Sequence, residues 1–192
     1  AVNAGDDTET SVAKATSTPF CDNIGSRKIA LVVVDDHAVN VKLLEHKIRR
    51  HFKGGGADVQ VLSATDGIMA LDVQTTVRDT RLGGSGGLIL AGIFMDFHMP
   101  NMDGIECTRR IRLLEASSGW PRVTICGCTA DVTEDARDSF QNAGGGEIIQ
   151  KPWRPGQVER VCNAMMASAL GAINTTAGLE GSESRISRGV PC

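Results

Sequence analysis

Residues Ile93 to Gly104 read IFMDFHMPNMDG, and this stretch decides the fold of the chain. An apolar run ends in a carboxylate, Asp96, and a turn cluster of Pro, Asn, Asp and Gly follows at once. That pattern is typical of a buried strand that delivers one acid to the carboxyl edge of a sheet. In an open α/β sheet ligands bind at that edge. The stretch therefore predicts a site around Asp96.

Strand-like and helix-like segments alternate on both sides of this stretch. Strands are predicted at 29–34, 59–62, within 88–96, at 123–128 and at 147–150. Helical spacing is found over about 39–51, 67–77 and 104–116, from Thr133 to about 143, and from Pro155 onward. Five strands alternating with five helices predict an α/β fold, with a mostly parallel sheet covered on both faces and right-handed crossovers.

The domain boundaries follow from composition. Residues 1–26 are rich in Thr, Ser, Ala and Asp, and predict a flexible N-terminal linker. Residues 27–170 form the predicted domain, and 171–192, which lack periodicity, are expected to be a disordered C-terminal tail. Glycine-rich stretches at 83–87 and 144–146 are expected to be mobile approaches to the third and fifth strands. Because residue 1 is Ala, we expect an excised piece of a longer protein.

Bulk properties exclude several classes of function. The net charge of −3 argues against direct nucleic-acid binding, which favours a basic face. No apolar run approaches the ~20 residues of a membrane span. We therefore expect a cytoplasmic chain, tethered to a membrane sensor kinase only through residues outside it. The cysteines are expected to be reduced and mostly buried, and Cys126 and Cys128, two apart on a strand, are favoured as small hydrophobes over metal ligands.

Polar residues fall where the predicted strands end. Asp35 and Asp36 follow the first strand, Asp96 ends the third, Thr129 follows the fourth and Lys151 the fifth. Carboxyl ends of parallel strands share one edge, so these groups should converge. Two like charges about 4 Å apart repel by roughly 4 kcal/mol at an effective dielectric near 20, and one lysine cannot neutralise three acids. The cluster predicts a Mg²⁺ site that also handles phosphate, with one carboxylate left as a nucleophile.

Each of these residues has an ordinary structural explanation when taken alone. An Asp pair after a strand is usually a turn or cap feature, and a lone Thr or Lys is usually structural or solvated. The joint occurrence at the right ends of the right strands favours a functional site.

The motifs together resemble those of the response-regulator receiver domain. They are VVDDHAVN at 33–40, MDFHMPNMDG at 95–104, Cys128-Thr129-Ala130 and Lys151-Pro152. The resemblance covers about residues 27–170 and is strongest to receivers of hybrid histidine kinases. It implies a flavodoxin-like (βα)5 doubly wound sheet of order 2-1-3-4-5.

The resemblance also implies roles. Asp96 would be the phosphoacceptor, served by a histidine kinase or a histidine phosphotransfer protein. Asp36, Asp96 and the backbone carbonyl of His98 would bind Mg²⁺ directly, with Asp35 acting largely through water. Thr129 and Lys151 would hold the phosphoryl oxygens. The chain would catalyse its own phosphorylation and signal through the face around strands four and five, and a cis Lys151-Pro152 bond is implied as well.

Three positions qualify this prediction. Ile148 stands where receivers often carry the aromatic residue that moves with the threonine, which puts that switch in question. His98 and Asp131 occupy positions that flank the phosphate, or are solvated loop residues. Two alternatives stay open, namely a receiver-like interaction module that takes no phosphate and a Mg²⁺-dependent phosphohydrolase. The spacing of Asp35 and Asp36 argues against the latter.

Overall fold

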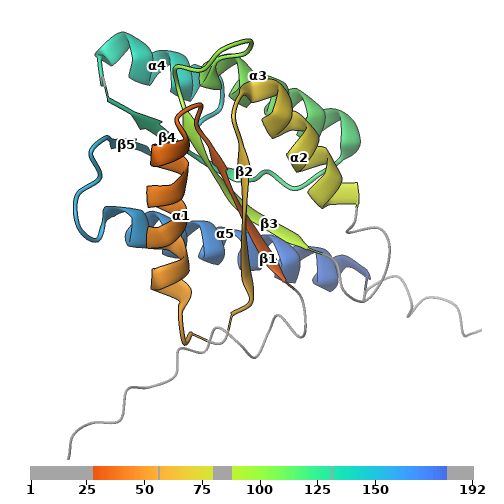
Figure 1. The fold of residues 1–192 in the computed structure, drawn as a ribbon. Coiled ribbons are helices and arrows are strands. Elements are labelled where there is room, and N and C mark those ends of the chain that lie inside the picture. Colours follow the sequence, from red (N-terminus) through yellow and green to blue (C-terminus); the bar gives the residue numbers. More distant parts are fainter. Residues whose placement is uncertain (1–27, 56, 80–87, 131, 181–192) are drawn as a thin grey trace, which may run out of the picture.

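Five parallel strands form one sheet in the order β2-β1-β3-β4-β5 (Figure 1). The structure, a computed structural model, describes residues 28–55, 57–79, 88–130 and 132–180, with the backbone alone for 174–180. The strands are β1 Ile29–Val34, β2 Val59–Ala64, β3 Ile89–Asp96, β4 Thr124–Thr129 and β5 Ile148–Gln150. The predicted fold class and strand order are confirmed.

Helices cover both faces of the sheet. They are α1 Ala38–Phe52, α2 Gly67–Asp79, α3 Gly104–Ser118, α4 Glu134–Asn142 and α5 Gln157–Glu180. The helices α1 and α5 lie on one face, and α2, α3 and α4 on the other (Figure 1). Alternate residues of β1 serve the two faces, since Leu31 and Val33 enter the core with α1 and α5, whereas Val32 and Val34 enter the core with α2 to α4. The continuous apolar run of β1 is thus buried on both sides, as predicted.

The last helix corrects two predictions. Pro155 was expected in its first turn, but α5 begins at Gln157, after a turn with Gly156 at φ +77°. The boundary of the tail at 171 is wrong for 171–180, because α5 continues to Glu180. Ile173, in the extended part of the helix, packs against the core cluster under α1 and α5. Residues 1–26 and 181–192 lie outside the described residues.

The glycine turn at 144–146 is more firmly held than its composition suggests. Arg112 Nε and Arg122 Nη2 both donate to the carbonyl of Gly144, at 2.9 Å each. Gly146 N donates to the carbonyl of Ile125. The side chain of Arg112 is half-buried where it makes this contact. The other predicted glycine-rich segment, 83–87, lies outside the described residues.

The described cysteines are buried free thiols, as predicted: Cys107, Cys126, Cys128 and Cys162. Burial raises the pKa of Cys107 and of Cys162 to about 12, so both thiols stay protonated at neutral pH. A hydrogen bond with Cys128, together with burial, raises the pKa of Cys126. Cys21 and Cys192 lie outside the described residues. None of these four thiols has the character of a metal ligand or a nucleophile.

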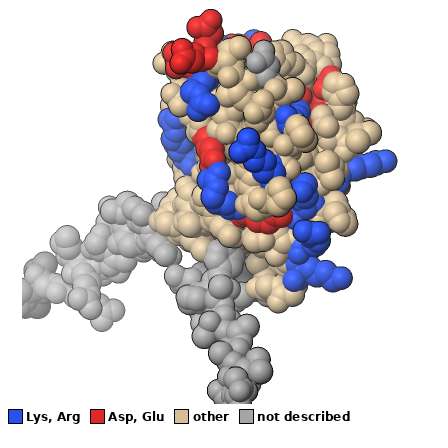
Figure 2. Space-filling view, turned by 90° about the vertical axis from the view of Figure 1, so that its left-hand side faces the viewer, with Lys and Arg blue, Asp and Glu red and all other residues tan. Residues whose placement is uncertain are grey.

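The surface is not evenly charged although the chain is mildly acidic. The outer side of α1 carries exposed Lys42, Arg49, Arg50 and Lys53. Figure 2 faces the side of the molecule with α1 and the β5–α5 loop, and Lys and Arg are spread over it. Among the described helices, none has the length and hydrophobicity needed to cross a membrane.

Candidate functional site

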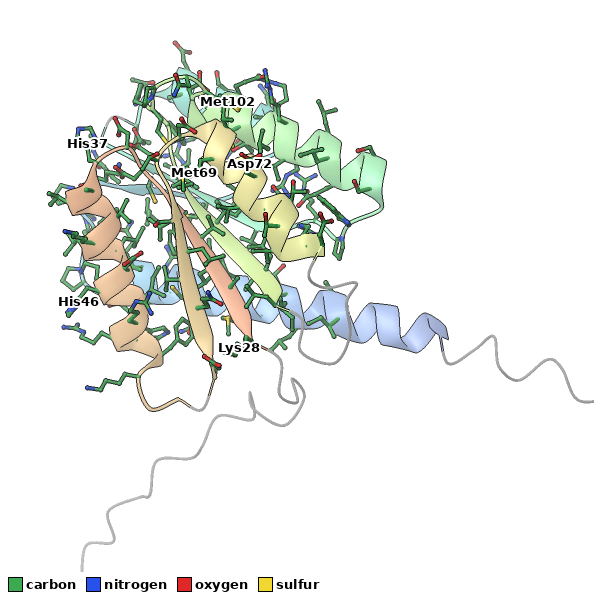
Figure 3. All side chains as sticks on the ribbon, turned by 45° about the vertical axis from the view of Figure 1, so that its right-hand side comes forward. Lys28, His37, His46, Met69, Asp72 and Met102 are labelled. Carbon is green, nitrogen blue, oxygen red and sulfur yellow. The ribbon has the colours of Figure 1, made fainter. Side chains whose placement is uncertain are left out.

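Strand register brings the predicted site residues to one edge of the sheet. Asp96 pairs with Cys128, the residue before Thr129, and Thr129 in turn pairs with Gln150, the residue before Lys151. Val34, which precedes Asp35, pairs with Met95. Figure 3 shows His37 at this carboxyl edge and Lys28 at the opposite edge. Because the strands are parallel, their carboxyl ends lie at one edge, and this brings the groups together.

Lys151 joins two of the three acids. Its Nζ lies 2.6 Å from Asp35 Oδ2 and 3.0 Å from Asp96 Oδ2. Burial works to lower the pKa of Lys151, but hydrogen bonds to Asp35 and Asp96 outweigh it, and the pKa is raised. The ammonium is therefore firmly protonated and fixed between the carboxylates.

Asp96 is the acid whose charge is least well compensated. Its Oδ1 accepts a hydrogen bond from Phe97 N at 2.8 Å, and the residue is only 5% exposed. Burial raises the pKa of Asp96, Lys151 opposes this effect, and the charge of Asp35 adds to it, so the pKa is raised overall. A single nearby cation does not offset the effects of burial and of a second acid on this pKa. A further positive charge at this edge would restore the ionised carboxylate.

Asp35 and Asp36 differ in how fully their oxygens are used. Asp35 Oδ1 accepts from His37 N at 2.9 Å and from Asn40 Nδ2 at 3.1 Å, and its Oδ2 holds Lys151. Asp36 is more exposed, and the partner it has among the described residues is His37 Nδ1, at 2.6 Å. The oxygens of Asp36 are thus more available to a ligand than those of Asp35.

His37 and Asn40 are site residues that the sequence reasoning did not assign. The oxygen and nitrogen atoms of Asp35, Asp36 and His37 that could bind a metal lie within 4.8 Å of one another. His37 and Asn40 both belong to the VVDDHAVN motif at 33–40. Their position next to the acid pair in the sequence is the signal that could have identified them as site residues.

The remaining predicted residues lie at the same edge. Thr129 is fully buried, and its carbonyl accepts from Lys151 N at 2.8 Å. His98 is exposed. Among the described residues nothing donates a hydrogen bond to its carbonyl, whereas the carbonyl of the preceding Phe97 accepts from Gly104 N. That pattern leaves the His98 carbonyl available to a ligand. Asp131 lies outside the described residues.

The donor set fits Mg²⁺. Three carboxylates against one ammonium leave an excess of negative charge, and burial, together with the charge of Asp35, raises the pKa of Asp96. Mg²⁺ prefers one or two carboxylates, waters and phosphate oxygens. Asp36, Asp96 and the His98 carbonyl offer such oxygens at the rim of the sheet, where phosphate can reach them.

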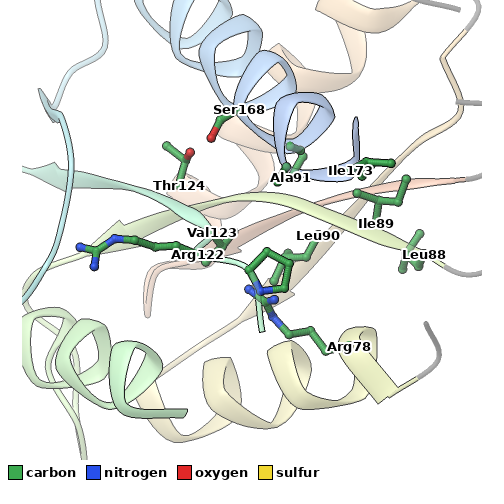
Figure 4. A pocket seen from close by; sticks show the side chains of 13 residues that line it. Arg78, Leu88, Ile89, Leu90, Ala91, Arg122, Val123, Thr124, Ser168 and Ile173 are labelled. Atoms are coloured by element: carbon green, nitrogen blue, oxygen red, sulfur yellow. The ribbon is translucent and has the colours of Figure 1, made fainter. Parts of the chain in front are cut away.

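A cavity of about 30 Å³ lies away from this site. It lies between the amino ends of β3 and β4 and the end of α5, and its lining includes Arg78, Thr124 and Ser168 (Figure 4). Its volume is that of about one water molecule.

A doubly wound parallel sheet with a cluster of Asp, Thr and Lys at its carboxyl edge defines an α/β domain with a candidate site at the edge where such sheets bind ligands. The response regulator receiver domain family matches residues 31–163. This match spans more than half of the chain, which therefore belongs to that family. The Lys151-Pro152 bond is cis, as the resemblance implied.

Known proteins agree with this assignment. The chain is 29% identical over 132 residues to hybrid signal transduction histidine kinase L, and 31% identical over 122 residues to kinase M, both of Dictyostelium discoideum. These matches cover 68% and 64% of the chain but only 7% and 4% of the relatives. The receiver domain of the histidine kinase CKI1 from Arabidopsis thaliana, solved with Mg²⁺ and BeF₃⁻, is 28% identical with a TM-score of 0.59, covering 72% of this chain and 89% of that one. The chain thus resembles receivers of hybrid histidine kinases.

Proposed function

We propose that the chain accepts a phosphoryl group on Asp96 from a phosphohistidine, with Mg²⁺ as the metal. The donor would be a histidine kinase or a histidine phosphotransfer protein. The observation that carries the proposal is the pairing of one lysine with two acids, Asp35 and Asp96, at the edge that also holds Asp36 and Thr129.

The transfer exchanges one bond to phosphorus for another. A carboxylate oxygen of Asp96 attacks phosphorus, the bond from phosphorus to the histidine nitrogen breaks, and the electron pair returns to the imidazole. Mg²⁺, held by Asp36, Asp96 and the His98 carbonyl, would offset charge on the transferring group and bring Asp96 to its ionised form. Lys151 and the Thr129 hydroxyl would bind phosphoryl oxygens, which requires Lys151 to exchange a carboxylate contact for a phosphoryl one.

Signal output is proposed at the face formed by β4, β5 and their neighbouring helices α4 and α5. Thr129 and Lys151 lie at the ends of β4 and β5, so a change in their contacts acts first on this face. Ile148, where receivers often carry an aromatic residue, is half-buried in β5. The side chain at this position is therefore aliphatic in this chain, and the switch that pairs an aromatic residue with the threonine stays in question.

Labelling with a small phosphodonor tests the proposal. We expect Mg²⁺-dependent phosphate incorporation, acid-stable and base-labile as an acyl phosphate should be, in the wild-type chain but not in Asp96→Asn. Asp103→Asn is the control, because Asp103 caps α3 through Glu106 N and does not contact Lys151. Labelling that survives in Asp96→Asn would refute the assignment.

The two rival functions give different results in the same assay. An interaction module would show no Mg²⁺-dependent incorporation. A phosphohydrolase would turn over phosphate monoesters many times per chain, whereas a receiver takes up at most one phosphoryl group per Asp96 and releases it slowly.

A further inference from the structure

We propose that Asp66 is a positioning residue for the metal site, because its hydrogen bond with Asn101 fixes the loop that carries the His98 carbonyl. The inference rests on the proposed function, in which that carbonyl is a ligand of Mg²⁺. Asp66 lies in the turn between β2 and α2, outside the group of acids around Lys151. It holds the loop between β3 and α3, residues 97–103, in the form that leaves the carbonyl available to a cation.

The two oxygens of Asp66 serve two different elements. Oδ1 accepts a hydrogen bond from Met69 N at 2.8 Å, and because Met69 is the third residue of α2, this bond is an ordinary helix cap. Oδ2 accepts from Asn101 Nδ2 at 2.8 Å, and this bond crosses to the β3–α3 loop. A backbone bond from Gly67 N to the Met102 carbonyl, at 3.2 Å, makes the same crossing. Figure 3 shows Met69 of α2 and Met102 of the loop at this end of the sheet.

Asn101 is the residue of the loop that needs such support. Its φ is +63°, and among the described residues it is the only one other than glycine with a positive φ. Side chains disfavour this left-handed conformation, although Asn adopts it more readily than most. The residue is exposed, and the hydrogen-bond partner that its side chain has among the described residues is Asp66. Asp66 is therefore the side-chain anchor of this backbone conformation.

The rest of the loop connects this conformation to the His98 carbonyl. Gly104 N donates to the Phe97 carbonyl at 3.0 Å, and Met102 N donates to the Pro100 carbonyl at 2.6 Å. The second bond closes a three-residue γ-turn centred on the left-handed residue, a turn that is rare because it is strained. His98 lies on the short span between the two bonded carbonyls. Its direction therefore depends on whether the γ-turn holds.

The geometry that Mg²⁺ requires makes this direction matter. Mg²⁺ demands near-ideal octahedral coordination, so a carbonyl that can turn away binds it less well than one held in place. A ligand fixed before binding also loses less conformational freedom when the metal binds. The bond from Asn101 to Asp66 thus contributes to metal affinity although neither side chain is a ligand.

The substitution Asp66→Ser separates the two bonds of this residue. Serine caps a helix about as well as aspartate, but its single short hydroxyl cannot also reach Asn101. In titration calorimetry of the full chain with MgCl₂ we expect the dissociation constant to rise by about tenfold, as when groups that orient a metal ligand are removed. Asp103→Ser is the matched control. Asp103 accepts from the third residue of its own helix, Glu106 N, at 2.8 Å, and its replacement removes the same charge. Its dissociation constant should match that of the wild type.

Exchanging the two side chains gives a rescue. In the double variant Asp66→Asn/Asn101→Asp the donor and the acceptor change places, and the net charge stays that of the wild type. Both residue types cap helices and tolerate a left-handed backbone, so we expect the affinity for Mg²⁺ to return. Hydrogen exchange of the Met102 N–H in the metal-free chain is the second readout. It should be faster in Asp66→Ser than in the wild type, and slow again in the double variant.

Three results would overturn the proposal. They are unchanged Mg²⁺ affinity in Asp66→Ser, an equal loss in Asp66→Ser and Asp103→Ser, and a double variant that regains neither affinity nor slow exchange. Labelling of Asp96 separates this inference from the proposed function. A wild type that takes no label refutes the phosphoacceptor assignment, whereas a labelled wild type with unchanged Mg²⁺ binding in Asp66→Ser refutes only the positioning role.

Discussion

At the scale of single residues, the site is a balance between one ammonium and two buried carboxylates. Lys151 contacts both Asp35 and Asp96, yet the pKa of Asp96 remains raised because burial is the larger effect. The charge of Asp96, the proposed phosphoacceptor, is thus incompletely compensated. This links the stability of the chain to the protonation of that carboxyl group.

Replacing Asp96 should stabilise the metal-free protein at neutral pH. Because the folded-state pKa of Asp96 lies above the ordinary aspartate value of 3.8, the folded chain binds this proton more tightly than the unfolded chain. The free energy of unfolding therefore falls as pH rises from about 3.8 through the folded-state pKa. Asp96→Asn removes this loss, so urea unfolding in EDTA should show it more stable than wild type at pH 7, with a smaller difference at pH 4.5.

Asp66 provides a control, because its pKa is shifted in the opposite direction to that of Asp96. Hydrogen bonds from Met69 N and from Asn101 lower its pKa, so Asp66 adds stability that is lost as pH falls. Asp66→Asn should therefore be no more stable than wild type at pH 7. Equal stability of Asp96→Asn and wild type at pH 7 would show that Lys151 fully compensates Asp96.

At the scale of elements, the sequence predicts the strands better than the helix surfaces. Strand ends follow from apolar runs and from acids at their carboxyl ends, whereas the strand order is implied by the resemblance to receiver domains. The buried face of a helix is harder to predict, because a periodic pattern does not show which polar residues are buried in the core. Gln74 and Arg78 of α2 are buried, whereas Val39 of α1 is 77% exposed. The amide of Gln74 has no hydrogen-bond partner among the described residues, and nothing in the structure explains its burial.

The candidate site likewise contains residues that the sequence predicts and contacts that it does not. Asp35, Asp36, Asp96, Thr129 and Lys151 could be placed from sequence because parallel strands align their carboxyl ends. The contacts of His37 and Asn40 could not, because they depend on the side-chain directions at the start of α1. The sequence pattern also did not predict the extension of α5 to Glu180, in which Ile173 packs against the core.

The close approach of β3 and α3 makes a test at this scale. A Cβ added at Gly104 would overlap the backbone carbonyl oxygen of Asp96, which cannot move without displacing the site. Gly104→Ala should cost at least ~1–3 kcal/mol of stability, as overpacking does, and should impair labelling of Asp96. Circular dichroism during urea unfolding measures the first effect.

The matched control is the same substitution in α5. A Cβ at Gly171 would meet nothing within 4 Å, and Ala favours a helix interior over Gly by about 1 kcal/mol. Gly171→Ala should therefore be stabilising and should not affect labelling. If the two variants changed stability in the same direction, steric overlap at Gly104 would not be the cause.

At the scale of the whole molecule, the proposed phosphoryl site and a buried ion-pair network lie at opposite edges of the sheet. The acids, Thr129 and Lys151 lie at the carboxyl edge. Near the amino end of β4, Glu115 of α3 accepts from Arg78 of α2 at 3.0 Å, from Arg112 at 2.7 Å and from Val123 N at 2.8 Å. The guanidinium of Arg78 also lies over the Trp120 ring, 5.3 Å from its centre. This buried network ties two helices to a central strand and contains no group of the phosphoryl site.

Removing the centre of this network should weaken the fold without reaching the site. Glu115→Ala leaves two arginines without their buried carboxylate, and we expect a loss of roughly 3–5 kcal/mol in the free energy of unfolding, measured by urea titration. Glu106→Ala is the control, because Glu106 also binds two arginines of α3, Arg109 and Arg110, but at the surface. Such pairs contribute little. Since the network lies at the amino edge, Glu115→Ala should still incorporate phosphate at Asp96 while it is folded. Equal unfolding midpoints for the two variants would show that burial does not distinguish the two glutamates.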